Sequence, residues 1–327
     1  MKYPTFLTDF IGYLETIKGV SNLTVKEYTY DIILFLKFLK LNKLNEDPYD
    51  DEIFYNAEIF DVPISDLDSV SISTLYSFMS YLDKHRKTSN RTRNRKTSSL
   101  RTFYEYLTVK TGLISNDPTK KLEFSKARPK NPIYLTLDEA KSLLSHVKHV
   151  QNEFISSRDF AIITLFLNCG LRLSELTSIN LNMIKGDILS VVGKGNKERT
   201  IYLNESSIEA INYYKLSRKK YLEDRKVENI ESIEALFISE RLTRMSNRAI
   251  QHRIEKYIKE IGLDPNLYTV HKLRHTAATL LYKYGEVDIR TLQVILGHES
   301  VATTQIYTHL DDSQIKKAVD KNPLNYK

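Results

Sequence analysis

The sequence predicts a mostly helical protein of two domains, the second of which carries a small antiparallel β-sheet. The chain of 327 residues is longer than one hydrophobic core usually supports, since cores stop growing near roughly 250–300 residues. Apolar residues recur with helical periodicity through most of the first hundred positions. Residues 184–203 instead alternate between apolar and polar side chains, as half-buried strands do.

The first domain is expected to span residues 1–112. Thr24 and Glu27 have the spacing of a capping box. They open a helical run whose apolar face holds Tyr28, Ile32, Phe35, Leu36 and Leu39. Further along, residues 44–83 contain ten Asp or Glu side chains and no Lys or Arg, so the charge of the chain is sharply segregated.

A basic segment follows this acidic stretch directly. Residues 84–107 hold eight Lys or Arg side chains, and Glu105 is the only acid among them. Ser, Thr and Asn lie between the cations, and such side chains hydrogen-bond phosphate oxygens. A solvated helix face is the alternative, because that is what most runs of charge are. We favour contact with nucleic acid through four of these cations, Arg91, Arg93, Arg95 and Lys96.

The prolines and weak periodicity of residues 113–132 predict an interdomain linker. The second domain, residues 133–327, begins with a capping-box pattern at Thr136 and Glu139. The strand-like stretch of this domain contains expected turns at Lys185-Gly186 and at 193–197. Its helices are expected over 157–169, closed by Gly170, and near 205–224, 247–261, 270–283 and 289–296.

The composition sets outer limits on function. The net charge of +7 permits a polyanionic partner without proving one. Cys169 is the only cysteine, which excludes an intramolecular disulfide and fits a reducing compartment. Asp9 and Glu15 interrupt the apolar stretch that a signal peptide needs. The most apolar run, residues 160–171, is too short to cross a bilayer. We therefore expect an intracellular protein with no membrane partner.

Two basic motifs lie in the second domain. Arg172 follows a buried helix and its terminating glycine, where a guanidinium is costly unless it meets an anion. That anion is either a ligand phosphate or Glu175, and the sequence leaves both open. Between the expected strands, glycines flank Lys194, so its ammonium can reach a phosphate. The segment lacks the GxxxxGK[ST] spacing of a nucleotide-binding loop, so nucleotide hydrolysis is not indicated.

A third motif starts the helix at 270–283, with Thr269 as the expected N-cap. His271 and Arg274 are three residues apart and share a helix face. His271 and His275 are four apart, which raises the alternative of a zinc site. No Glu completes an HExxH pattern, and Arg274 would put a cation beside the metal. We therefore predict no metal and no cofactor. The remaining alternative to a functional role for His271 is that it is a structural histidine at the helix cap.

The last motif combines a histidine and a tyrosine. His298 follows Gly297 at a helix end, and Tyr307 comes nine residues later. A phenol with a pKa of about 10 is a weak nucleophile at neutral pH. Cations favour its phenolate and a positioned base can take its proton. With the arginines, lysine and histidine of the earlier motifs, the set supplies what attack on a phosphodiester needs, namely charge neutralisation, an acid and a nucleophile.

The order of these motifs resembles the tyrosine recombinase family, most closely its simple Xer-type members. The likeness is strongest over residues 133–310 and implies an N-terminal helical, SAM-like core-binding domain followed by a catalytic domain. Lys194 would protonate the leaving 5′-oxygen, and Tyr307 would form a 3′-phosphotyrosine. The catalytic residues implied by the resemblance are Arg172, Lys194, His271, Arg274, His298 and Tyr307, with Glu175 in support.

The resemblance also implies partners. Such recombinases act on double-stranded DNA as a homotetramer on two sites, with a dimer at each site, or as a hetero-assembly with a paralogue. They exchange strands through a Holliday junction without ATP or a metal. The tail at 311–327 would dock onto a neighbouring protomer, and the segment 242–257 would face DNA with Arg244 and Arg248. We expect a cytoplasmic, nucleoid-associated protein.

Two departures from the family pattern bear on the biological role. The acidic insertion near 44–68 is unusual, and it should face solvent or a protein partner because it would repel DNA. We also expect no arm-binding domain ahead of the core, which would favour chromosome dimer resolution or site inversion over the integration of a mobile element. The rival functions are a non-catalytic DNA-binding regulator and a relaxing topoisomerase. The complete catalytic set argues against the first, and the docking tail argues against the second.

Overall fold

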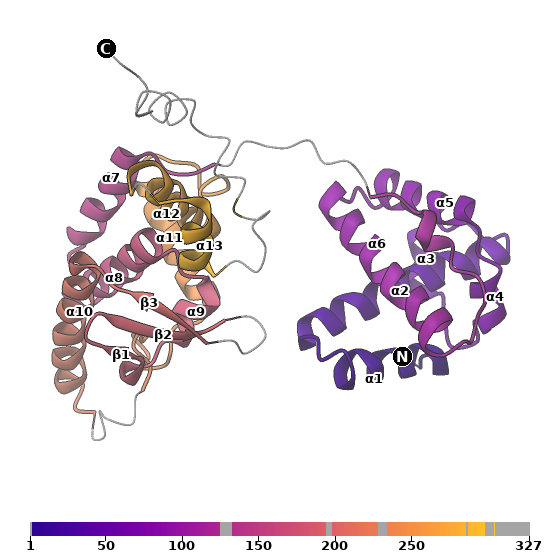
Figure 1. The fold of residues 1–327 in the computed structure, drawn as a ribbon, viewed down its shortest axis with the longest axis horizontal. Coiled ribbons are helices and arrows are strands. Elements are labelled where there is room, and N and C mark those ends of the chain that lie inside the picture. Colours follow the sequence, from indigo (N-terminus) through magenta and orange to yellow (C-terminus); the bar gives the residue numbers. More distant parts are fainter. Residues whose placement is uncertain are drawn as a thin grey trace, which may run out of the picture. The chain divides into compact units, whose positions relative to one another are not determined.

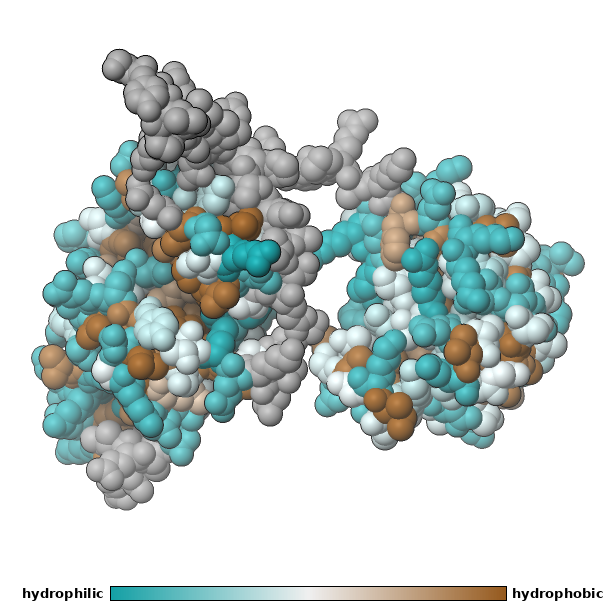
Figure 2. All heavy atoms as spheres, in the orientation of Figure 1, coloured by the Kyte–Doolittle hydropathy of each residue, from teal (hydrophilic) through white to brown (hydrophobic). Residues whose placement is uncertain are grey.

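The computed structural model describes residues 2–124, 133–193, 198–227, 234–285, 287–297 and 304. The chain divides into two compact units, Met1–Pro129 and Lys130–Lys327, and each has its own hydrophobic core (Figure 1). The visible face of each unit is mainly hydrophilic, with scattered hydrophobic residues (Figure 2). Within the described ranges, no helix is both long and apolar enough to span a membrane.

Unit 1 is helical throughout its described residues. Its elements are α1 (Thr5–Thr16), α2 (Asn22–Lys43), α3 (Asp51–Asn56), α4 (Ile64–Asp68), α5 (Ile72–Lys84), α6 (Asn90–Glu105), a π-helical turn η1 (Tyr106–Lys110) and a 3-10 turn η2 (Pro118–Lys121). The predicted start of α2 at Thr24 is wrong by one turn. Ser21 is the N-cap, and its side chain accepts a hydrogen bond from the backbone N–H of Thr24.

The acidic stretch is part of the core of unit 1. It forms α3 and α4, and Phe54, Ile59 and Leu67 are each no more than 3% exposed. Its carboxylates also have local partners, since Asp61 pairs with Lys40 at 2.7 Å. A second pair joins Lys43 to Asp66 at 2.6 Å. The stretch therefore contributes apolar side chains to the core, while two of its acids pair with the lysines at the end of α2.

Part of the predicted linker belongs to unit 1. Ile114 and Leu122 are buried in its core. The Asp68 carboxylate accepts hydrogen bonds from the backbone N–H groups of Ser115 and Asn116, at 2.8 and 2.9 Å. Residues 113–124 of the predicted linker therefore belong to unit 1, and Pro118 starts the 3-10 turn η2 there.

Unit 2 combines helices with one small sheet. Its elements are α7 (Leu137–Lys148), α8 (Glu153–Cys169), α9 (Leu173–Ser178), η3 (Leu181–Met183), β1 (Ile184–Lys185), β2 (Ile188–Val192), β3 (Glu198–Tyr202), α10 (Glu205–Asp224), α11 (Asn247–Glu260), α12 (Val270–Tyr284) and α13 (Ile289–Leu296). This mainly helical architecture with a small antiparallel sheet confirms the predicted fold class.

Helix α8 forms the centre of unit 2. Nearly all of its residues are buried, and it packs against α7, α10 and α12. The capping box at Thr136 and Glu139 starts α7 as predicted, with both reciprocal hydrogen bonds present. Gly170 ends α8 in the left-handed conformation, at φ +58°. A side chain there would collide with α13, since a Cβ atom would lie 2.8 Å from Leu296 Cδ2.

The three strands form one antiparallel sheet in the order β1-β2-β3. Leu189 lies opposite Ile201 in the register of β2 and β3, and both side chains are buried. The alternate side chains of β2 are exposed, which is the period-2 pattern that predicted these strands. Arg199 on β3 joins Arg172, Glu175 and Arg274, which lie at the start of α9, on α9 and on α12, in a polar cluster of unit 2.

Candidate active site

The first predicted arginine lies where α8 turns into α9. Arg172 is the N-cap of α9, and its backbone N–H donates to Glu175 Oε2 at 2.8 Å. The Arg172 guanidinium donates from Nη1 to Glu175 Oε1 at 2.7 Å. Glu175 is only 1% exposed, whereas the side chain of Arg172 is 30% exposed. The alternative of an internal ion pair is therefore realised, and it leaves one side of the guanidinium open to solvent.

A second arginine shares this carboxylate. Arg199 on β3 donates from Nη2 to Glu175 Oε2 at 2.9 Å and from Nε to Oε1 at 3.3 Å. Burial pushes the pKa of Glu175 upward, but hydrogen bonds and charge from Arg199 and Arg172 outweigh burial and hold this pKa below its usual value. Glu175 therefore stays ionised at neutral pH and fixes both guanidiniums.

The second predicted arginine approaches from α12. Arg274 is 8% exposed, and its guanidinium donates to the carbonyl oxygen of Gly170. Three arginines then meet the C-terminal end of α13, each at a different one of three consecutive carbonyl oxygens. Arg199 donates to Ile295 at 2.6 Å, Arg274 to Leu296 at 2.6 Å and Arg172 to Gly297 at 2.5 Å. These carbonyls carry the negative end of the helix dipole, which guanidiniums stabilise.

The histidines of α12 differ in their environment. His271 is exposed on the first turn, with Thr269 as the N-cap, as predicted. Burial above all, with a smaller effect of neighbouring cations, lowers the pKa of His275 to about 4. His275 is thus neutral at neutral pH and adds no charge beside Arg274.

Three of the predicted catalytic residues, Lys194, His298 and Tyr307, lie outside the described residues. Their place in the chain is nevertheless informative. Lys194 belongs to the segment between β2 and β3, and His298 directly follows Gly297 at the end of α13. The described part of the site therefore consists of Arg172, Glu175, Arg199, Arg274 and the end of α13, with His271 three residues before Arg274 on α12.

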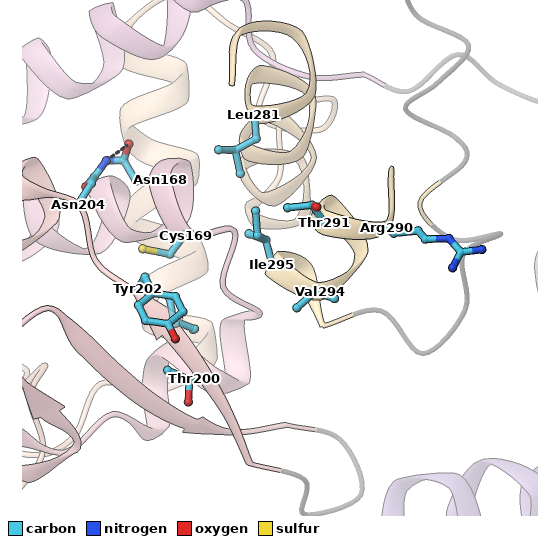
Figure 3. A pocket seen from close by; sticks show the side chains of 11 residues that line it. Asn168, Cys169, Thr200, Tyr202, Asn204, Leu281, Arg290, Thr291, Val294 and Ile295 are labelled. Atoms are coloured by element: carbon cyan, nitrogen blue, oxygen red, sulfur yellow. Dashed lines mark hydrogen bonds between the residues drawn. The ribbon is translucent and has the colours of Figure 1, made fainter. Parts of the chain in front are cut away.

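An apolar cavity of about 660 Å³ lies beside this site, between β3 and the pair α12 and α13. Leu281, Ile295, Tyr202 and the buried Cys169 are among the residues that line it (Figure 3). Val294 is 77% exposed and Tyr202 75% exposed at its rim. Burial raises the pKa of the Cys169 thiol to about 11, so this cysteine is an unreactive apolar residue here.

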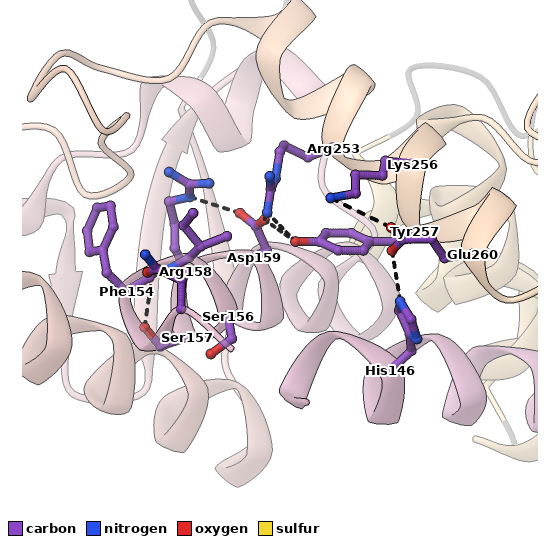
Figure 4. A network of polar contacts seen from close by, with 12 residues as sticks. His146, Phe154, Ser156, Ser157, Arg158, Asp159, Arg253, Lys256, Tyr257 and Glu260 are labelled. Carbon is purple, nitrogen blue, oxygen red and sulfur yellow. Dashed lines mark hydrogen bonds and ion pairs between the residues drawn. The ribbon is translucent and has the colours of Figure 1, made fainter. Parts of the chain in front are cut away.

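A buried ionic network lies elsewhere in unit 2 and joins α8 to α11 (Figure 4). Asp159 is 2% exposed and accepts hydrogen bonds from Arg158 at 2.8 Å, from Arg253 at 2.7 Å and from the Tyr257 hydroxyl at 2.7 Å. Burial and the Asp159 charge raise the pKa of Tyr257, so its hydroxyl remains a donor. This network fixes the orientation of α11 on the core.

Known proteins resemble this chain over nearly its whole length. The sequence pattern of the phage integrase family matches residues 134–314. A tyrosine recombinase XerC of Caldanaerobacter subterraneus subsp. tengcongensis is 50% identical over 325 residues, which cover 99% of this chain and 88% of that protein. The chain belongs to the phage integrase family. It is a tyrosine recombinase of the Xer type, an enzyme of site-specific recombination.

More distant relatives agree with this assignment. A tyrosine recombinase XerC of Leptospira interrogans serovar copenhageni is 31% identical, over 95% of this chain and 91% of that one. The crystal structure of the XerH site-specific recombinase bound to a palindromic difH substrate has the same fold. It superposes with a TM-score of 0.67 at 20% identity and covers 98% of this chain and 99% of that one.

The basic segment of this recombinase is more neutralised than its sequence indicated. Glu105 is the only acid within the basic segment, but folding brings acids from α2 and α5 next to its cations. Arg93 pairs with Asp83 at 2.5 Å. Arg95 and Lys96 both pair with Asp31, at 2.5 and 2.6 Å.

The four residues predicted to contact DNA therefore differ in their burial and in their partners. The Lys96 side chain is 4% exposed, so its ammonium serves the core of unit 1, and we leave it out of the proposed DNA contacts. Arg91, in contrast, is exposed and has no hydrogen-bond or ion-pair partner among the described residues. Burial is the property that sequence reasoning missed here.

The two cations predicted to face DNA from the segment 242–257 also differ. Arg244 donates to the carbonyl oxygens of Thr177 and Ile179 at 2.8 and 3.1 Å, which ties the start of α11 to the end of α9. Arg248 is exposed on α11 and has no partner in the described part of the chain. Arg248 is therefore the better candidate for a phosphate contact.

Sequence reasoning also missed Arg199. The signal was available in the strand pattern, since Arg199 and the buried Ile201 are two residues apart and therefore point to the same face of β3. A charged residue on an inward-facing strand position requires a partner.

Proposed function

We propose that this recombinase cleaves duplex DNA with Tyr307 as its nucleophile, while Arg172 and Arg274 hold the scissile phosphate. The observation that carries the proposal is the convergence of both guanidiniums on the end of α13, the helix that leads directly to His298. The convergence concentrates positive charge at the end of α13, and the proposed nucleophile follows ten residues after Gly297 in the sequence. Phosphoryl transfer needs such charge to stabilise its transition state.

In the proposed reaction, the Tyr307 oxygen forms a bond to phosphorus while the bond from phosphorus to the 5′-oxygen breaks. His271 takes the phenol proton, and Lys194 gives a proton to the departing 5′-oxygen. His298 donates a further hydrogen bond to the phosphate. The resulting 3′-phosphotyrosine keeps a phosphoester bond, so a 5′-hydroxyl from a second DNA strand can reverse the step without ATP.

Arg172 has the donors that this role requires. A guanidinium carries five N–H groups. Glu175 and the Gly297 carbonyl take one each, and the other side-chain donors of Arg172 have no partner in the described part of the chain. Glu175, which stays ionised, can therefore hold Arg172 while the remaining donors bind a phosphate.

The decisive experiment uses a nicked suicide DNA substrate, in which cleavage traps the covalent adduct. The parent protein should form a denaturation-resistant protein–DNA adduct, and Tyr307→Phe should abolish it. Tyr284→Phe is the matched control, because Tyr284 is 66% exposed on α12 and has no part in the proposed chemistry. DNA binding without an adduct in the parent would instead favour a non-catalytic regulator.

Lys194→Ala tests the proposed general acid on the same substrate. The variant should slow cleavage and spare DNA affinity, because the lysine acts in the proton-transfer step. Equal losses of cleavage and affinity would mean that Lys194 only contacts the DNA backbone.

We further propose that four copies act on two DNA sites, with the tail at 311–327 of one copy docking on the next. The apolar cavity beside α13 supports this, because its lining and the exposed Val294 suit an apolar segment (Figure 3). Val294→Asp should prevent tetramers on DNA and leave binding to a single site intact, as measured by sedimentation. Val109→Asp is the matched control, since Val109 is 63% exposed on unit 1. Tetramers of Val294→Asp would contradict the docking.

The biological role proposed is the resolution of chromosome dimers, in the cytoplasm at the nucleoid. Its support is the 50% identity to a protein named tyrosine recombinase XerC. Recovering the DNA bound by this protein in cells tests the role. A single site on the chromosome is expected, and recovery of the ends of a mobile element would point to integration instead.

A further inference from the structure

The carboxylate of Glu175 depends on two arginines for its hydrogen bonds. Arg172 supplies a backbone N–H and Nη1, and Arg199 supplies Nε and Nη2. A carboxylate offers about four lone-pair positions, so these donors satisfy Glu175 in full. Arg199 therefore contributes half of the bonds that keep this buried acid ionised and oriented toward Arg172.

Arg199 also reaches the end of α13 with its remaining arm. Its Nη1 donates to the Ile295 carbonyl at 2.6 Å, and its side chain is only 14% exposed. Arg172 contacts the same helix end but is 30% exposed. In the proposed function the remaining donors of Arg172 bind the phosphate, whereas all three side-chain nitrogens of Arg199 contact Glu175 or the end of α13.

The side chain of Arg199 also packs closely against Gly297, the residue that ends α13. Gly297 has φ +63°, and a Cβ atom at this position would lie 2.8 Å from Arg199 Cδ. The close approach of Arg199 to the end of α13 thus favours glycine at this position. The same arginine lies on β3, which follows the segment that contains Lys194.

We propose that Arg199 is a positioning residue for recombination, which fixes Glu175 against Arg172 and holds the end of α13 while the phosphate is bound. This inference rests on the proposed function of Arg172 and Tyr307. Arg199 acts through Glu175 and α13 and does not touch the DNA. The two alternatives are an ion pair that serves folding alone and a direct phosphate contact.

Arg199→Lys separates these possibilities in the full-length protein. A lysine keeps the charge beside Glu175, but one ammonium cannot reproduce the planar fork that joins Glu175 to Ile295. Arg158→Lys is the matched control. Arg158 is also buried, pairs with a carboxylate and donates to a backbone carbonyl, that of Ile238 at 3.1 Å, but it lies in the network of α8 and α11.

The first measurement is hydrogen exchange of the α13 backbone amides. Exchange should become faster in Arg199→Lys and stay at the parent rate in Arg158→Lys. The second measurement is adduct formation on the suicide substrate at saturating DNA. Because a displacement of about 1 Å can cost on the order of 100-fold in rate, Arg199→Lys should cleave roughly 10–100-fold more slowly with unchanged DNA affinity. Arg158→Lys should cleave like the parent.

The pH dependence of cleavage supplies a readout that folding alone would not move. Arg199 holds down the pKa of Glu175. In Arg199→Lys, the fall in cleavage rate on acidification should therefore begin at a higher pH than in the parent.

The outcomes are distinct. Parent-like exchange of α13 in Arg199→Lys overturns the inference whether or not the protein cleaves DNA. Equal cleavage by Arg199→Lys and Arg158→Lys also overturns it, and so does a loss of DNA affinity that matches the loss of cleavage. If the parent protein forms no Tyr307-dependent adduct, the proposed function itself is wrong.

Discussion

Asp31 of unit 1 provides a quantitative test of how the fold uses its basic segment. Asp31 is 1% exposed and binds Lys96 at 2.6 Å, Arg95 at 2.5 Å and the Ser99 hydroxyl at 2.7 Å. The Lys96 side chain is 4% exposed, whereas that of Arg95 is 33% exposed. The two cations therefore differ in what happens when the carboxylate is removed.

Asp31→Asn should destabilise unit 1 strongly, because it leaves the Lys96 ammonium buried without an anion. Removing one partner of a buried ion pair costs roughly 3–5 kcal/mol, a large part of the free energy of unfolding of a small domain. Lys96→Met should cost less, roughly 1–3 kcal/mol, since Asp31 keeps Arg95 and Ser99. The double variant should be more stable than Asp31→Asn alone, because it has no buried ammonium.

Hydrogen exchange of peptides from α2 and α6 during denaturant titration reports on unit 1 alone and therefore suits this test. The reasoning fails if the costs of the two single variants simply add in the double variant, since that would mean that the charges are not coupled. DNA binding gives an independent check. Lys96→Met should keep the DNA affinity of the parent and its dependence on salt. A shallower salt dependence would mean that Lys96 does contact DNA phosphates.

Three further predictions concern other residues. Gly170→Ala should lower the free energy of unfolding by about 1–2 kcal/mol for the left-handed backbone alone, with a further cost because its Cβ would lie 2.8 Å from Leu296; an unchanged unfolding midpoint would contradict this. For His275, the folded pKa of about 4 lies below the ordinary value of 6.5, so the unfolded chain binds the proton first as pH falls. The stability that neutral His275 contributes is present above pH 6.5 and is lost between pH 6.5 and 4. His275→Gln should therefore flatten the free energy of unfolding across that window in urea titrations, and an unaltered slope would refute the assignment. Finally, Arg91→Gln should reduce the slope of log DNA affinity against log salt by about 1 without a change in stability. Arg95→Gln should instead lower the free energy of unfolding. Equal effects of the two variants on both properties would contradict this distinction.

Local sequence patterns determined most of the fold. Apolar periodicity and capping signals identified the start of α7 and the bounds of α10 to α13 almost to the residue, and alternation identified β2 and β3. These patterns succeed because helix and strand formation depend on side chains close together in the chain. The error at the start of α2 has the same local origin, since Ser21 and Thr24 are both acceptable caps and only one is used.

The candidate site was predicted in part. Arg172, Glu175 and Arg274 were predicted, and the structure brings all three to the end of α13 or to the side chains that contact it. Arg199 was missed because its partners, Glu175 and Ile295, are distant in sequence. The roles of Lys194, His298 and Tyr307 remain predictions from the sequence.

The sequence by itself determined the class of chemistry, because the types and order of the reactive side chains are written in it. It also determined the helices and strands that carry them. Only the tertiary structure decided which charges are free for a ligand. Arg91 and Lys96 belong to one basic run, yet Lys96 is buried against Asp31 and Arg91 is exposed. The physical reason is that the fate of a charge depends on desolvation and on acids brought close by folding, and neither is visible in the order of residues.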